Sequence, residues 1–262
     1  MSAILGPFSG YILWDAVWSG TTPSTGYSVG DFAYMKPGKK VIYGTTTVTV
    51  TATLAGGARK ADLFAFPMHN IDAGSSKLSL TNGSGLNVVI AVPTQPTGPY
   101  GRLPLTTVCD LRTLANAATR TASVWNVVIT SNSVSVRLGA GMWLGTAVDF
   151  CFRPRATRGH HFSNGNETSF YQEVNRIRSR TRRRSLQFAV PSLDAQRDQI
   201  LDAVDSGEGS GLPSVLWPIT TVNDGLYGSF GDEVSDTWVR PNYSPMDDLV
   251  FTEWSKGIPF LP

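Results

Sequence analysis

Residues 44–54 read GTTTVTVTATL, in which threonine alternates with valine, alanine and leucine. Successive side chains of a β-strand point to opposite faces of its sheet, so this period of two gives one apolar face and one face of hydroxyl groups. β-Branched residues are also enriched in strands. The segment therefore predicts a strand that is buried on one face, and such a face needs a second layer to cover it.

Short apolar runs separated by turn residues continue this pattern along the first 154 residues. Asn82–Gly85 is expected to form a turn, 131–133 a hairpin turn, and the four prolines within 93–104 a loop. Residues 1–23 have no clear period and are interpreted as an extended arm or an edge segment. Further strands are expected at 61–66, 77–81, 86–92, 124–129, 133–138 and 142–152. Strands and turns at this spacing predict a jelly-roll β-sandwich over residues 1–154.

Charge changes sharply after residue 152. Nine arginines lie between Arg153 and Arg184, whereas residues 185–262 hold twelve acidic residues against three basic ones. Residues 155–184 are therefore interpreted as a basic linker, and 185–262 as a small β-rich module that ends in a C-terminal arm. One helix is expected at 192–206, because Ser192 can cap it and Gly207 can end it. The predicted fold class is all-β, with a sandwich followed by a smaller β-rich module carrying one α-helix.

An arginine-rich segment inside that linker is the first candidate contact site. It comprises Arg176, Arg178, Arg180, Arg182, Arg183 and Arg184. In an extended chain, alternate arginines would share one face at intervals of about 7 Å. Such a stripe can bind phosphates or carboxylates. The acidic C-terminal part favours carboxylates of a protein partner, including another copy of the chain, over nucleic acid. No aromatic residues are interleaved to stack on the bases of a single strand.

The sequence offers no constellation that is typical of catalysis. Of its three histidines, His69 is followed by Asn70 and is interpreted as structural in a loop, and His160-His161 lack nearby metal-ligand partners. No serine lies in a Gly-x-Ser-x-Gly turn. The carboxylates that a glycoside hydrolase would need are available at Asp232, Glu233, Asp236, Asp247 and Asp248, but a solvated acidic face explains them better. We therefore expect no enzyme activity, no metal and no cofactor.

Tryptophans near turns and chain ends form a second candidate site. They are Trp14, Trp18, Trp217, Trp238 and Trp254. Such residues can be core residues, anchors of a protein interface, or surfaces on which a sugar ring stacks. The two cysteines, Cys109 and Cys151, are interpreted as small buried side chains of a reduced protein. The N-terminal segment lacks the basic start and long apolar run of a signal peptide or membrane span, so no membrane insertion is expected.

Five segments together resemble a known group of proteins. Residues 62–70, DLFAFPMHN, followed by a turn of small residues and a short strand, are similar to a galactose-binding-like jelly roll. The whole arrangement resembles minor tail and tail-tip proteins of long-tailed bacteriophages. The later segments are 184–188 (RSLQF), 216–219 (LWPI), 226–230 (LYGSF) and 249–253 (LVFTE). The resemblance implies a virion protein, and because the acidic cluster of calcium-binding jelly rolls is missing, it implies no metal.

These observations predict a structural subunit of a phage virion, in the tail tip or baseplate or as a tail-associated adaptor. It would be made in the bacterial cytoplasm and assemble with copies of itself and other virion proteins into a symmetric ring or collar. The alternative is a module that binds host surface carbohydrate. A third and weaker hypothesis is an enzyme that cleaves glycans.

Overall fold

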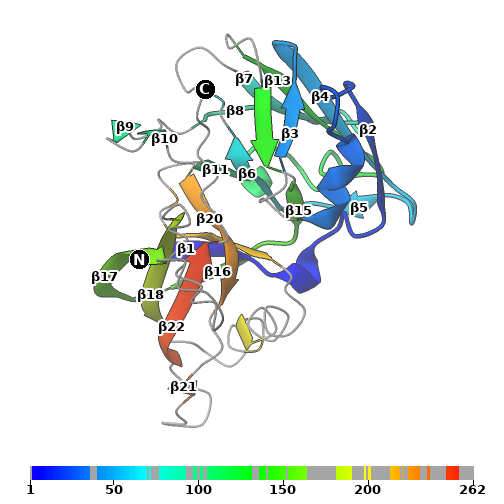
Figure 1. The fold of residues 1–262 in the computed structure, drawn as a ribbon. Coiled ribbons are helices and arrows are strands. Elements are labelled where there is room, and N and C mark those ends of the chain that lie inside the picture. Colours follow the sequence, from blue (N-terminus) through cyan, green and yellow to red (C-terminus); the bar gives the residue numbers. More distant parts are fainter. Residues whose placement is uncertain are drawn as a thin grey trace, which may run out of the picture.

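The protein is described by a computed structural model (Figure 1). It describes residues 2–35, 40–69, 71, 77–92, 97–98, 101–102, 105–131, 136–139, 141–151, 153–163, 181–190, 198, 200–201, 213–218, 220, 224–230, 235–236 and 246–253. The fold is all-β, as predicted, and it is a jelly-roll β-sandwich followed by further strands. All of the strand pairs within these residues are antiparallel.

A five-stranded sheet forms one layer of the sandwich. Its order is β2-β4-β13-β7-β8. The bounds are β2 Ala16–Gly20, β4 Thr47–Leu54, β13 Val124–Thr130, β7 Lys77–Asn82 and β8 Asn87–Ile90. Burial alternates along β4 and β13, which confirms the period-two pattern in the sequence.

A thirteen-stranded sheet forms the other layer and continues beyond it. Its main path is β16-β1-β19-β20-β11-β6-β14-β3. The bounds are β16 Val148–Cys151, β1 Ser2–Gly6, β19 Ser214–Trp217, β20 Asp224–Phe230, β11 Leu105–Asp110, β6 Leu63–His69, β14 Val136–Gly139 and β3 Lys40–Tyr43. Off this path lie β15 Trp143–Gly145, β17 Arg153–Ser163, β18 Thr181–Val190, β21 Ser235–Asp236 and β22 Met246–Glu253.

Short elements connect these strands. Two-residue strands form the pairs β5–β12 and β9–β10, and three 3-10 helices lie in connections. Their bounds are β5 Arg59–Lys60, β12 Thr121–Ala122, β9 Thr97–Gly98, β10 Gly101–Arg102, η1 Phe8–Gly10, η2 Val29–Tyr34 and η3 Leu111–Thr113. Of the predicted helix at 192–206, residues 198, 200 and 201 are described, and they are helical.

The sandwich encloses the main apolar core. The five-stranded sheet contributes buried residues such as Val50 and Trp125, and the opposite layer contributes Phe64, Phe66 and Leu138. Aromatic rings stack within it, and Phe64 and Phe66, both on β6, lie at a centroid separation of 6.1 Å. Burial of this many large side chains supplies most of the favourable free energy of folding.

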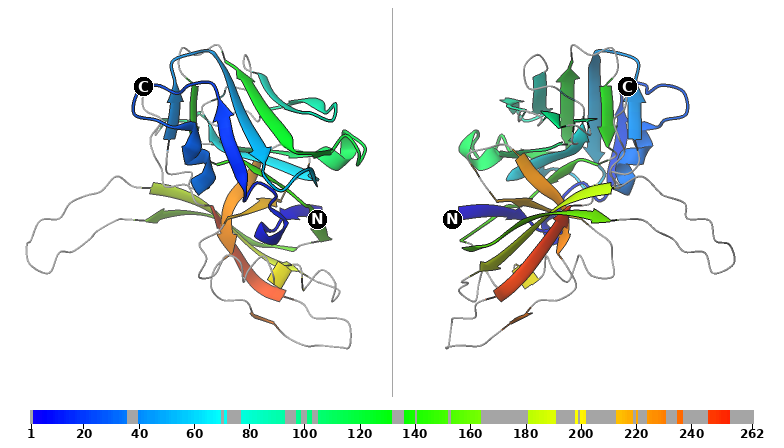
Figure 2. Two further views of the ribbon diagram at one scale, coloured as in Figure 1. Left: turned by 90° about the vertical axis from the view of Figure 1, so that its right-hand side faces the viewer. Right: turned by 60° about the vertical axis from the view of Figure 1, so that its left-hand side comes forward.

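Three strands are buried on both faces and join the sandwich to the C-terminal strands. In β1, Ile4 belongs to the main core, whereas its neighbours Ala3 and Leu5 belong to a second core. β19 and β20 divide in the same way, with Trp217 and Tyr227 on the side of the main core. The second core also contains Leu186, Ile200, Leu216, Leu226, Phe230, Leu249 and Phe251. Figure 2 shows the strands around this second core, among them β18 and β22, curling beneath the sandwich.

This arrangement corrects several predictions about local structure. The start of the chain is no arm, because β1 pairs with β16 on one edge and β19 on the other; β2, however, is an edge strand as expected. The expected linker contains β17, which pairs with β18. The expected hairpin at 131–133 is wrong, because β13 and β14 lie in different sheets. Within 93–104, β9 and β10 replace part of the expected loop. The domain boundaries at 154 and 184 stay predictions.

Gly228 allows three strands to meet where the sandwich joins the C-terminal strands. It lies on β20 opposite Ser214 of β19 and Glu253 of β22. A Cβ atom at this position would overlap the carbonyl oxygen of Thr252. Because backbone cannot yield as a flexible side chain does, we expect Gly228→Val to lower the free energy of unfolding by about 1–3 kcal/mol. Urea denaturation followed by circular dichroism measures this loss.

Gly83 provides the matched control for that substitution. It lies in the turn between β7 and β8, and a Cβ there would meet no atom within 4 Å. Gly83→Ala should change the unfolding free energy by no more than about 0.5 kcal/mol. Equal losses for Gly228→Val and Gly83→Ala would show that the junction at β20 is not tightly packed.

Candidate functional site

An exposed tryptophan lies in the turn before β2. Trp14 is 68% exposed, and the guanidinium carbon of Arg59 lies 4.5 Å from the centroid of its ring. A cation over an aromatic face is attracted by the negative potential of that face. Because the guanidinium covers one face only, an exposure this large requires the rest of the indole to face solvent. The ring is therefore exposed, and Arg59 contacts one of its faces.

Arg59 is itself held by a bidentate ion pair. Its Nη1 donates to Asp15 Oδ1 at 2.6 Å and its Nη2 donates to Asp15 Oδ2 at 2.7 Å. Nη1 also donates to the carbonyl of Ile12 at 2.7 Å, and Gly56 N–H donates to Asp15 Oδ2 at 2.9 Å. Hydrogen bonds from Arg59 hold the pKa of the Asp15 carboxyl below its usual value, and those same bonds raise the pKa of Arg59. We call Trp14, Asp15 and Arg59 the Trp14 platform.

A pocket of about 560 Å³ lies at the opposite edge of the five-stranded sheet. Its apolar lining includes Val89 and Leu114, which are 66% and 52% exposed, and the buried Trp217. Its polar lining includes Asp110 and Asp149. We call it the β8–β11 pocket. Its volume lies within the range of about 300–1,000 Å³ that is typical of ligand sites.

Arg112 fixes the two carboxylates of this pocket. It donates to Asp110 through Nε and Nη2, at 2.9 and 2.8 Å, and to Asp149 through Nη1 and Nη2, at 2.6 and 2.8 Å. Hydrogen bonds to the two carboxylates raise the pKa of Arg112 well above its usual value, and the bonds to Asp110 have a larger effect than those to Asp149. Asp110 also accepts the backbone N–H of Arg112 and so caps η3. The pocket thus presents positioned carboxylate oxygens beside apolar side chains.

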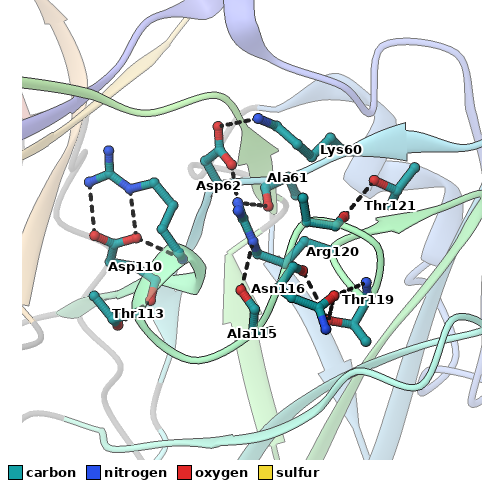
Figure 3. Close-up of polar contacts among 12 residues, drawn as sticks. Lys60, Ala61, Asp62, Asp110, Thr113, Ala115, Asn116, Thr119, Arg120 and Thr121 are labelled. Carbon is teal, nitrogen blue, oxygen red and sulfur yellow. Dashed lines mark hydrogen bonds and ion pairs between the residues drawn. The ribbon is translucent and has the colours of Figure 1, made fainter.

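A buried ion pair holds the loop that carries part of this pocket. Arg120 donates to Asp62, to the carbonyl of Ala115 at 3.0 Å and to the carbonyl of Ala61 at 3.3 Å. Both charged side chains are about nine-tenths buried, whereas Lys60, 3.4 Å from Asp62, is half exposed. Figure 3 shows Arg120 between Asp62 and Ala115, with Asp110 and Thr113 at the other end of the same loop. We interpret this cluster as structural.

The structure separates the predicted tryptophans. Trp14 is exposed as described, whereas Trp18 is partly buried and stacks on Phe32 at 5.4 Å. Trp217 is buried in the core and reaches the pocket lining. Trp238 and Trp254 lie outside the described residues. The interpretation as core residues therefore applies to Trp18 and Trp217, and exposure remains for Trp14.

The predicted arginine-rich segment is described in part. Arg182, Arg183 and Arg184 lie on β18 and pair in register with Phe162, His161 and His160 of β17. Arg176, Arg178 and Arg180 lie outside the described residues. The described strands therefore place three of the six arginines on a two-stranded ribbon, which runs away from the sandwich in Figure 2.

The remaining predicted residues are placed by the backbone alone. His69 ends β6, where it pairs with Leu105 and Leu138, and Asn70 lies outside the described residues. Asp247 and Asp248 lie within β22 rather than in a turn, and Asp247 pairs with Ser235. In the described part of the chain, histidine, cysteine and acidic side chains form no group of three that could hold a metal ion. The described residues also contain no helix long and apolar enough to cross a membrane.

Both cysteines are free, but the structure corrects the prediction that both are buried. Cys151 is exposed at the end of β16, whereas Cys109 is buried in β11. Burial, with a smaller effect of the Asp110 charge, raises the pKa of the Cys109 thiol to about 12. Because the thiolate is the reactive form, and about 0.01% of Cys109 is thiolate at pH 8, we expect Ellman's reagent to modify one thiol quickly in the folded protein and two in guanidinium chloride. Two fast thiols in the folded protein would contradict this burial.

Several residues of these sites were not identified from the sequence. Asp15 and Arg59 are 44 positions apart, and Arg112 is 37 positions from Asp149. The contact between Asp110 and Arg112 could have been anticipated from the sequence. An aspartate side chain often accepts the backbone N–H of the residue two positions later and so forms a turn.

Comparisons with known proteins give a likeness of fold for about half of the chain. No family model and no curated protein sequence matches it. A chitosan-binding module of a chitosanase/glucanase from Paenibacillus sp. IK-5 has 11% identity and a TM-score of 0.37, covering 52% of this chain and 99% of that one. A family 32 carbohydrate-binding module of Clostridium perfringens NanJ, solved with galactose, has 12% identity and a TM-score of 0.36, covering 54% and 98%. SpGH29 has 13% identity and a TM-score of 0.38, and the match spans 54% of this chain and 29% of that protein. At this level of likeness neither a binding site nor a ligand carries over to this chain.

Proposed function

We propose that this chain binds carbohydrate and that the Trp14 platform is the contact surface. The observation that carries this proposal is the exposed indole of Trp14, held from one face by Arg59. One face of a sugar ring consists of weakly positive C–H groups, and these pack on the negative face of an aromatic ring. A rigid indole loses little conformational freedom when a ring stacks on it, which favours binding.

The polar neighbours of Trp14 suit the hydroxyl groups of the same sugar. Asp15 supplies carboxylate oxygens and Arg59 supplies N–H donors, and their mutual ion pair fixes both. Adjacent hydroxyl groups can accept from one such group and donate to the other. A few positioned polar groups beside an apolar contact are the usual composition of a small-molecule site.

A glycan array probed with the complete chain tests this proposal. We expect binding to a restricted set of glycans, and we expect Trp14→Ala to bind them much more weakly. A wild-type chain that binds no glycan, or a Trp14→Ala chain with the same binding pattern, would overturn it. Tyr34→Ala provides a matched control, because Tyr34 is another exposed aromatic residue, at the end of η2.

We propose as a second candidate the assembly role predicted from the sequence, with the virion as its setting. The observation in its favour is the backbone of β18. Ser185, Leu186 and Phe188 pair with both β17 and β22, whereas in the described residues 181–184 pair with β17 alone. A strand edge of this kind can pair with a strand of another chain. Arg182, Arg183 and Arg184 occupy this part of β18 and would favour an acidic partner.

Light scattering at low and high salt tests the assembly role. We expect the wild-type chain to form an assembly that dissociates as salt screens the charges. The variant that combines Arg182→Glu with Arg184→Glu should stay monomeric, with a circular dichroism spectrum like that of the wild type. A wild-type monomer at both salt concentrations, or an assembly that persists in the variant, would contradict this role.

A further inference from the structure

We infer that the β8–β11 pocket is a second carbohydrate site, which takes one sugar unit independently of the Trp14 platform. The inference rests on the proposed function for the class of its ligand. Its own evidence is the pocket of about 560 Å³, whose lining combines fixed carboxylates with exposed aliphatic residues. No residue of the Trp14 platform lines it.

The polar side of this pocket requires a ligand that donates hydrogen bonds. Four of the five N–H donors of Arg112 are directed at Asp110 and Asp149. Thr113 donates its hydroxyl hydrogen to the carbonyl of Asp110 at 3.0 Å. These groups therefore offer oxygen acceptors to the pocket. Hydroxyl groups, or the ammonium group of an amino sugar, meet that requirement.

The apolar residues of the lining favour a ligand that also has an apolar surface. Val89 of β8 and Leu114 after η3 are both more than half exposed, and both line the pocket together with the buried Trp217. Val89 contradicts the expectation that residues 86–92 form a buried strand. A sugar ring combines a face of C–H groups with a rim of hydroxyl groups, so it suits a lining that has both apolar and acceptor groups.

The carboxylates of the pocket are held rigidly enough to select among sugars. Asp110 is locked by three hydrogen bonds from Arg112, and Arg112 is locked by Asp149 in turn. Fixed acceptors favour a sugar whose hydroxyl groups can reach them, because a hydroxyl group on the wrong side of the ring cannot form the same hydrogen bond. We therefore expect epimers such as glucose and galactose to differ in affinity.

Two sites of this kind would make one chain bivalent. The platform lies at the start of β2 and the pocket at β8, which are opposite edges of the five-stranded sheet. Four strand spacings separate these edges, or about 19 Å. A single chain could therefore contact two branches or two chains of a glycan, and avidity would follow without assembly of the protein.

Nuclear magnetic resonance of the ¹⁵N-labelled complete chain tests the inference. The probes are galactose, glucose, N-acetylglucosamine and glucosamine, each added to about 50 mM to detect millimolar affinity. We expect the backbone amides of Thr113 and Leu114 to shift, together with the indole N–H of Trp14. A preference for glucosamine that weakens with salt would identify an ammonium group as the donor, and its absence would identify hydroxyl groups.

Two variants separate this inference from the proposed function. Asp149→Asn replaces one carboxylate oxygen of the pocket by an amide nitrogen, so we expect about tenfold weaker binding at Thr113 and Leu114. The Trp14 signal should be unchanged, because Asp149 is an exposed residue and the substitution keeps its shape and the Asp110–Arg112 pair. Trp14→Ala should leave the shifts at Thr113 and Leu114 intact. If only the Trp14 signal responds to sugar, this inference is wrong and the proposed contact surface stands. If only the pocket amides respond, the Trp14 platform is wrong and the pocket stands. If neither responds, both are wrong.

Discussion

Replacement of Arg120 by methionine is expected to lower the free energy of unfolding by about 3–5 kcal/mol, because it leaves the Asp62 carboxylate buried without its partner. The same change removes the hydrogen bonds from Arg120 to the carbonyl groups of Ala61 and Ala115. These bonds tie the loop after η3 to the start of β6. Urea denaturation at pH 7 measures the loss, because the transition midpoint falls by that amount divided by the denaturant slope.

Two further variants show whether the cost arises from the unpaired charge. Combining Asp62→Asn with Arg120→Met removes both charges, so we expect this double variant to lose less stability than the sum of its two single changes. Lys60→Met is the matched control, because Lys60 also contacts Asp62 but is half exposed, and it should cost less than about 1 kcal/mol. Additive losses in the double variant would contradict the buried ion pair.

The period of the sequence predicted the strands better than it predicted how they pair. The Thr–Val alternation located β4, and its buried face is the apolar one. The short connection at 131–133 suggested a hairpin, yet β13 pairs with β4 and β7, and β14 pairs with β3 and β6. Two strands paired as a hairpin and two strands in different sheets have the same alternation of apolar and polar residues. Which strands pair depends on contacts between distant parts of the chain. Local periodicity does not contain that information.

For the candidate sites, the sequence likewise indicated the types of residue but not their exposure or their contacts in the fold. Trp14, Trp18 and Trp217 were equivalent candidates, and their exposure depends on what the fold places over them. Trp217 is buried because β19 is covered on both faces, by the sandwich core and by the second core. Arg59 was not a candidate, because its role depends on contact with Asp15 and Trp14, which lie more than forty residues earlier. Such a pair becomes visible only when the fold is known.

Replacement of Trp14 by alanine is expected to weaken glycan binding about 30- to 1,000-fold, or about 2–4 kcal/mol, the usual effect of removing a central aromatic contact. The folded state should lose little stability, because the indole is largely exposed. Trp14→Phe should retain part of the affinity, because a smaller ring still offers a face for stacking. Arg59→Met should also weaken binding, because it frees the indole to rotate and removes the donors beside it.

The most direct test of the proposed function is an isothermal titration of the glycan selected on the array. It compares the complete wild-type chain with Trp14→Ala and with the control Tyr34→Ala, all confirmed as folded by thermal denaturation. We predict unchanged affinity for Tyr34→Ala and, for Trp14→Ala, loss of the heat that belongs to the stacking site. Equal affinity and equal stoichiometry in all three proteins would contradict carbohydrate binding at the Trp14 platform.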